Sequence, residues 1–162
     1  MTSNSIFINL KNGYLKIESF VVISLFISLV ALVFMEVVVR AFDSPTRWSV
    51  GVAQLIFMWL IFIGANQALR GNSHIGIDIV TQLLPKQFQR YLAFGVNALL
   101  VLFLAMLVYY GLEMTFANTG RIISGTSIGY FYTTLAVPVG AFLMLITGVF
   151  QMINLIKASS KT

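Results

Sequence analysis

Residues 20–39 read FVVISLFISLVALVFMEVVV, an apolar run with one charged side chain, Glu36. A helix needs about 20 mostly apolar residues to cross about 30 Å of hydrocarbon. The run is therefore long enough to span a membrane. It exceeds the roughly 7–15 apolar residues of a cleaved signal peptide, and no small-residue cleavage site follows it. We expect an uncleaved first membrane helix here.

Three further apolar runs follow along the chain. Residues 48–69 and 91–112 carry no charge, and neither does the longer run 122–156. The last run opens with the turn-like sequence IISGTSIG, which places its membrane span at 129–153. Helices are expected because a lone open sheet would leave unpaired backbone groups in lipid. The sequence predicts an all-α integral membrane protein, with residues 1–162 forming a single membrane domain.

The composition supports this class and excludes several others. The chain is 59% hydrophobic and only 9% charged, against about 25% charged residues in soluble domains. It has no cysteine and a single histidine, so disulfides, iron–sulfur clusters and multi-histidine metal sites are not available within one chain. No cluster of Lys and Arg suggests nucleic-acid binding. We expect no enzyme activity and no catalytic, cofactor-binding or metal site.

The basic residues predict the orientation, because cytoplasmic loops carry an excess of Lys and Arg. Three basic residues lie in the first and third loops: Arg40, Arg47 and Arg121. The other seven lie in the two tails and the second loop: Lys11, Lys16, Arg70, Lys86, Arg90, Lys157 and Lys161. Both termini are therefore expected in the cytoplasm.

The second loop contains a short amphipathic segment, IGIDIVTQLL, at residues 75–84. Ile75, Ile79 and Leu83 are spaced four apart, whereas Asp78 and Gln82 share another face. Ten residues are too few to cross a bilayer. The pattern predicts a short helix lying in the membrane interface with its apolar side in contact with lipid.

Arg70, His74 and Asp78 are also four residues apart and are the most polar group near a membrane helix. On a continuous helix they would share one face, as a proton relay or a partner-docking site requires. Gly71 and Gly76 interrupt such a helix. The alternative is a capped helix end with an Arg–Asp pair, and we favour that interpretation.

Two other polar pairs are candidate subunit-interface or structural residues. Glu36 and Arg40 have the spacing and order of a favourable helical ion pair. They could neutralise each other, contact a partner subunit or form an ion site. Asn66 and Gln67 lie inside the second span, where amides usually bond to a neighbouring helix. Binding of substrate is the alternative role for these two amides.

Two stretches resemble the small membrane subunit of the tripartite ATP-independent periplasmic (TRAP) transporters. They are FMWLIFIGANQALRGNSHIGIDIVTQLLP and SIGYFYTTLAVPVGAFLM. Many members of that family carry an acidic residue about eight positions before the tryptophan of the pattern, and here SVGVAQ, at 49–54, has none. The residues that fit the pattern are Trp59, Gly64, Ala68, Arg70, His74, Ile75, Asp78, Leu84, Pro85, Tyr130 or Tyr132, Pro138 and Gly140.

The resemblance implies one subunit of a sodium-coupled symport system in a bacterial inner membrane that imports organic anions, meaning carboxylates, with sialic acid as one candidate. A periplasmic substrate-binding protein would capture the anion and a large permease subunit would move it. Sodium coupling would reside in the large subunit, whose static scaffold this chain would extend. The alternative from the residues alone is a stand-alone four-helix exporter acting as a homodimer, since such exporters use a glutamate in their first helix.

Overall fold

Four long helices make up the computed structural model, which describes residues 2–71 and 86–159. They are α1 (Thr2–Ala41), α2 (Ser49–Gly71), α4 (Lys86–Ala117) and α5 (Phe131–Ser159). Each is long and apolar enough to cross a membrane, which confirms the predicted all-α membrane class. The predicted interfacial helix at 75–84 lies outside the described residues.

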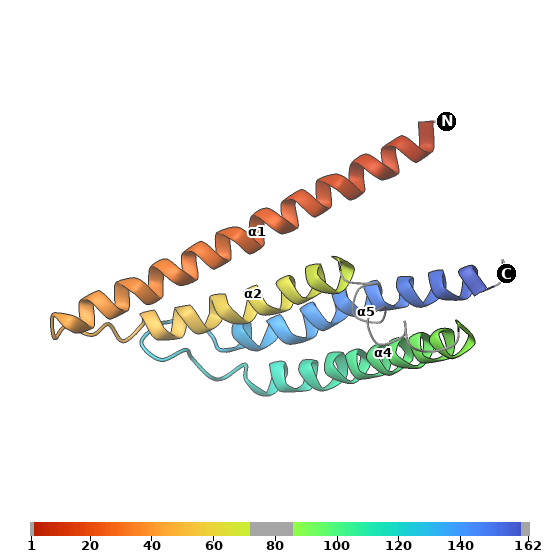
Figure 1. The fold of residues 1–162 in the computed structure, drawn as a ribbon. Helices are drawn as coiled ribbons and strands as arrows, with labels where there is room; N and C mark the ends of the chain where they lie inside the picture. The colour runs from red at the N-terminus through yellow and green to blue at the C-terminus, as the bar shows by residue number, and fades with distance from the viewer. Residues whose placement is uncertain (1, 72–85, 160–162) are drawn as a thin grey trace.

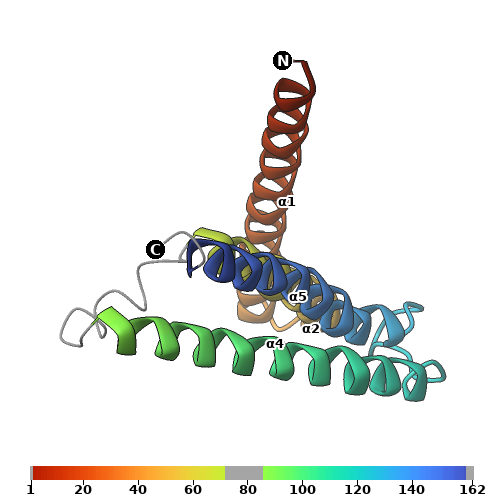
Figure 2. The same ribbon diagram turned by 90° about the vertical axis from the view of Figure 1, so that its right-hand side faces the viewer.

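The helices form an open row in the order α1, α2, α5, α4. Contacts join α1 to α2, α2 to α5, and α5 to α4 (Figure 1). Within the described ranges, the remaining helix pairs make little or no contact. Viewed from the side of the chain termini, α1 rises away from the other three helices toward its N-terminal end (Figure 2). The row therefore encloses no central space.

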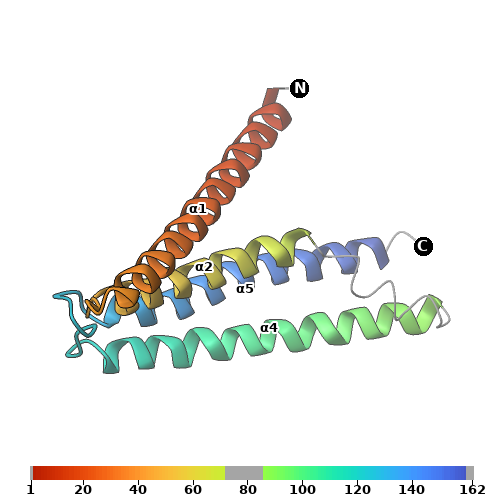
Figure 3. The ribbon, with the colours of Figure 1, turned by 60° about the vertical axis from the view of Figure 1, so that its left-hand side comes forward.

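The two ends of the row differ. One end, here the hairpin end, carries the connections 42–48 and 118–130. The other, the terminal end, carries both chain termini (Figure 1). α1 and α2 come together at the hairpin end and diverge toward the terminal end (Figure 3). α1 has 40 residues, about 60 Å of helix, so it extends beyond the end of α2.

The turn after α1 has the hydrogen bonds of a Schellman motif. Ser44 N–H donates to the carbonyl of Val39 at 3.2 Å, and Asp43 N–H donates to that of Arg40 at 3.1 Å. Asp43 adopts φ 55°, the left-handed conformation that this motif requires. The turn directs the chain sharply back, so that α2 starts beside the end of α1.

The connections at the hairpin end pack on each other. Ile123 and Ile128 are hydrogen-bonded at 2.9 Å, and Tyr130 N–H donates to Arg121 at 2.8 Å. Gly125 has φ +75°, and a Cβ there would overlap the carbonyl oxygen of Arg47. Only glycine meets both conditions without strain. The two connections therefore form one continuous cap.

Glycines allow the close approach of α5 to its two neighbours. A Cβ on Gly140 would overlap Phe62 of α2, and a Cβ on Gly111 of α4 would lie 3.2 Å from the ring of Pro138. Small residues allow membrane helices to approach closely, and van der Waals contact then holds them together. The Pro-Val-Gly sequence of α5 thus has a packing role on both sides of that helix.

Gly140→Ala is expected to push α2 away from α5 and to lower the free energy of unfolding by about 1–3 kcal/mol. Gly64 of α2 is the matched control, because no atom lies within 4 Å of a Cβ built there. Gly64→Ala should leave stability unchanged or raise it slightly through helix propensity. Thermal unfolding in detergent measures both variants, and equal unfolding temperatures would contradict the packing assigned to Gly140.

Candidate functional site

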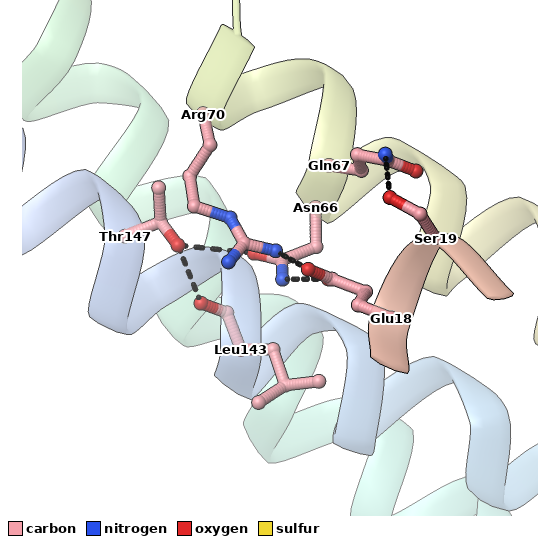
Figure 4. A network of polar contacts seen from close by, with 7 residues as sticks. All are labelled: Glu18, Ser19, Asn66, Gln67, Arg70, Leu143 and Thr147. Atoms are coloured by element: carbon pink, nitrogen blue, oxygen red, sulfur yellow. Dashed lines mark hydrogen bonds and ion pairs between the residues drawn. The ribbon is translucent and has the colours of Figure 1, made fainter. Parts of the chain in front are cut away.

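The terminal polar cluster joins three helices and consists of Glu18 on α1, Asn66 and Arg70 on α2, and Thr147 on α5 (Figure 4). Asn66 Nδ2 donates to Glu18 Oε1 at 2.9 Å. Arg70 Nη2 forms an ion pair with the other carboxylate oxygen, Oε2. Thr147 Oγ1 lies 3.0 Å from Asn66 Oδ1. The buried carboxylate of Glu18 thus binds the side chains of Asn66 and Arg70 on α2. The amide of Asn66 also links α2 to Thr147 on α5.

Glu18 and Asn66 are almost entirely buried, with 6% and 1% of their surfaces exposed. A buried charge is costly unless it is paired and hydrogen-bonded. The guanidinium of Arg70 supplies the charge and Asn66 supplies a neutral donor. The ring of Tyr14 lies 5.1 Å from the guanidinium carbon of Arg70, which adds a cation–π contact.

Two further hydrogen bonds flank the terminal polar cluster. Gln67 Nε2 donates to Ser19 Oγ at 2.9 Å and so links α2 to α1. Gln151 Nε2 donates to the backbone carbonyl of Leu69 at 2.9 Å and so links α5 to the last turn of α2. That carbonyl is among the last four of the helix, which have no partner within the helix itself. The end of α2 is therefore held from both sides.

The hairpin polar cluster consists of Glu36, Thr46 and Ser49. Ser49 Oγ donates to Glu36 Oε2 at 2.6 Å, and Thr46 Oγ1 contacts the same oxygen. Thr46 Oγ1 also lies 2.7 Å from Ser49 Oγ. Glu36 and Ser49 are both buried. The carboxylate of α1 therefore lies at the first residue of α2, where the positive end of a helix dipole favours negative charge.

The structure brings some of the sequence candidates together. Arg40 contacts Glu36 at 3.4 Å, although 68% of the Arg40 side chain is exposed. Asn66 and Gln67 both bond to the neighbouring α1, as amides in membrane helices usually do. Arg70 pairs with Glu18. His74 and Asp78 lie outside the described residues.

Sequence reasoning missed the central residue of the terminal polar cluster. Glu18 precedes the apolar run 20–39 from which the first membrane helix is predicted, yet α1 is continuous through it. The local indication of a polar contact at Glu18 is that it lies next to Ser19 and one helical turn after Tyr14. Its partners lie 48 and 52 positions away, so spacing along the chain does not reveal them.

The arrangement is suited to holding helices together. Among residues 2–71 and 86–159, no three His, Asp or Glu side chains gather where they could hold a metal ion. The polar groups described above are directed at each other, from one helix to the next. Four apolar helices long enough to cross a membrane define a multi-pass membrane protein, and the polar contacts described above join its neighbouring helices.

Comparison with known proteins identifies the family. The chain belongs to the DctQ component family of tripartite ATP-independent periplasmic transporters, whose sequence profile matches residues 29–158. This confirms the resemblance seen in the sequence: the chain is a small permease component of a TRAP transporter in a bacterial membrane. Members of this family are transporter components and not enzymes.

Several relatives share the similarity. The sialic acid TRAP transporter permease protein SiaT of Haemophilus influenzae is 27% identical over 132 residues, which are 80% of this chain but only 21% of SiaT. The sialic acid TRAP transporter small permease protein SiaQ of Vibrio cholerae is 22% identical over 143 residues, 88% of this chain and 83% of SiaQ. The C4-dicarboxylate small permease DctQ of Pseudomonas aeruginosa is 38% identical over 65 residues, 40% of this chain and 28% of that protein.

Glu36→Ala should destabilise the chain more than Arg40→Ala. Loss of the carboxylate leaves the buried Ser49 hydroxyl without its acceptor, whereas an exposed helical ion pair contributes little. Glu36→Ala is expected to lower the unfolding temperature by several degrees, and Arg40→Ala to leave it nearly unchanged. The unfolding temperatures of the two variants, whose substitutions lie one helical turn apart, are compared by thermal unfolding. Both variants remove the ion pair, so a loss for Arg40→Ala as large as that for Glu36→Ala would show that the ion pair matters more than the hydroxyl contacts.

Proposed function

We propose that this chain is a static subunit that extends the scaffold of a large permease in a sodium-coupled, binding-protein-dependent importer of organic anions. The observation that carries the proposal is the open row of helices. Among residues 2–71 and 86–159, α1 contacts mainly α2 and α4 contacts α5, and a row of this kind encloses no route for a solute. Transport then requires further membrane helices from a partner.

The relative SiaT supports a large membrane partner. The region similar to this chain makes up 21% of SiaT, so the SiaT permease carries much additional chain in the same polypeptide. We infer that a separate large subunit supplies this chain with the equivalent of that additional part of SiaT. The sodium-binding groups are assigned to that subunit, because the acidic side chains on α1 are already engaged with α2.

The substrate class is assigned from the relatives' names. They are described as sialic acid and C4-dicarboxylate transporter proteins, and both kinds of solute are carboxylates. We propose an organic anion of this class, delivered by a periplasmic substrate-binding protein. The polar clusters of this chain are directed at its own helices, so choice of the anion belongs to the partner subunit and the binding protein.

The alternative of a stand-alone homodimeric exporter requires an available membrane carboxylate on the first helix. Both carboxylates of α1 within the membrane-length segment are occupied. Glu18 binds Asn66 and Arg70, and Glu36 binds Ser49 and Thr46. Their contacts favour the subunit function over the exporter.

Transport assays test the proposal. The chain reconstituted alone should show no uptake of sialic acid or C4-dicarboxylates with or without a sodium gradient. Reconstitution with its large permease subunit and binding protein should give sodium-dependent uptake, and omission of this chain should abolish or strongly reduce it. Uptake or efflux by the chain alone, together with a stable homodimer in mild detergent, would support the exporter instead.

Thiol labelling tests the proposed orientation, with the hairpin end in the periplasm and both termini in the cytoplasm. The chain contains no cysteine, so single-cysteine variants report without background. Ser44→Cys, in the exposed connection after α1, should react with a membrane-impermeant maleimide in intact cells. Lys157→Cys, near the end of α5, should react only after the inner membrane is permeabilised. The reverse pattern would place the termini outside.

A further inference from the structure

α1 is an edge helix of the row and is attached mainly to α2. Its polar links to α2 and to the connection before α2 lie near two points, the terminal polar cluster and the hairpin polar cluster. Between Phe20 and Met35, no hydrogen bond among the described residues joins α1 to another helix. Large apolar side chains on this stretch are exposed, among them Phe20 at 72% and Ile27 at 61%.

The two attachments differ in how the chain constrains them. At the hairpin end only residues 42–48 separate α1 from α2, and the cap formed with Gly125 packs against that connection. At the terminal end the partners of Glu18 are 48 and 52 positions away in sequence. The helices also diverge toward this end (Figure 3). At the terminal end, α1 is held to α2 by side-chain contacts alone. At the hairpin end, the short connection 42–48 limits the movement of α1 relative to α2.

Apolar packing alone does little to fix the position of α1 on α2. Lipid tails are as apolar as the side chains of the helix, so there is no hydrophobic drive for α1 to stay on α2. Interhelical hydrogen bonds and ion pairs then decide the position of the helix. Glu18 provides the strongest of these at the terminal end, because its two oxygens bind two different side chains of α2 (Figure 4).

We propose that Glu18 is a positioning residue. Its contacts with Asn66 and Arg70 hold the terminal end of α1 against α2, and α1 pivots about the hairpin polar cluster when these contacts are lost. The distance from Glu36 to the start of α1 is 34 residues, about 50 Å of helix. A swing of about 10° about Glu36 therefore moves the start of α1 by about 9 Å. The contacts of Glu18 therefore determine the position of the terminal end of α1, and the packing of the hairpin end does not depend on them.

Distance measurements between pairs of spin labels test this inference in the full chain, reconstituted in lipid nanodiscs. The labels go on exposed positions of the cysteine-free sequence. Ile17→Cys with Ile153→Cys reports on the terminal end, and Val37→Cys with Ile122→Cys reports on the hairpin end. All four side chains are at least 40% exposed, so the labels should not disturb the packing.

Glu18→Ala should shift the terminal-end distance by several ångströms or broaden its distribution about twofold, and leave the hairpin-end pair unchanged. Glu18→Gln should give a smaller change, because its amide oxygen still accepts from Asn66 while the ion pair with Arg70 is lost. This milder variant also serves where the alanine variant does not fold. Ser28→Ala, an exposed change on the same helix, is the matched control and should alter neither pair.

Two results would overturn the inference. An unchanged terminal-end distribution in Glu18→Ala, or in Glu18→Gln where the alanine variant does not fold, would show that apolar packing and the Gln67–Ser19 hydrogen bond place α1 without the Glu18 ion pair. Equal broadening of both pairs would show a general loosening of the chain with no pivot at the hairpin end. Neither readout depends on transport, so the result separates this inference from the proposed function.

Discussion

A carboxylate within a membrane-length helix must find its partners in the protein, because the surrounding hydrocarbon offers none. α1 carries two such carboxylates, Glu18 and Glu36, and each has found partners in the next segment of the row. Glu36 binds the hydroxyls at the start of α2, and Glu18 binds Asn66 and Arg70 near its end. α1 therefore contacts α2 near both of its ends. This is why α1 belongs to the row although its apolar surface is largely exposed.

The other helix contacts depend on shape more than on polarity. Gly140 allows the ring of Phe62 to approach α5, and Gly111 allows that of Pro138 to approach α4. The terminal polar cluster also reaches α5 through Thr147. α2 and α5 thus form the centre of the row, with polar and close-packed contacts on both. α1 and α4 are its edges, and an edge helix leaves one side free for lipid or another protein.

The sequence predicted the membrane class because hydropathy is a local property that each helix displays by itself. The Glu36–Arg40 contact was also predictable, since residues four apart meet on any helix. Prediction was poorer where a residue's partners depend on how helices pack. Glu36 has closer partners in Thr46 and Ser49 than in Arg40. Glu18 was overlooked entirely, because α1 continues as a helix well before its apolar run begins.

The stretch 49–54, which has no acidic residue, contains one position without room for a side chain. Eight positions before Trp59 is Gly51, and a Cβ built there would overlap Cγ2 of Ile123 in the connection between α4 and α5. No side chain fits at this position while Ile123 occupies it. The start of α2 nevertheless has a carboxylate nearby, because Glu36 reaches it from α1. Glu36 thus places a negative charge at the N-terminus of α2, where the helix dipole favours it, and Gly51 leaves the space beside α2 to Ile123 of the cap at the hairpin end.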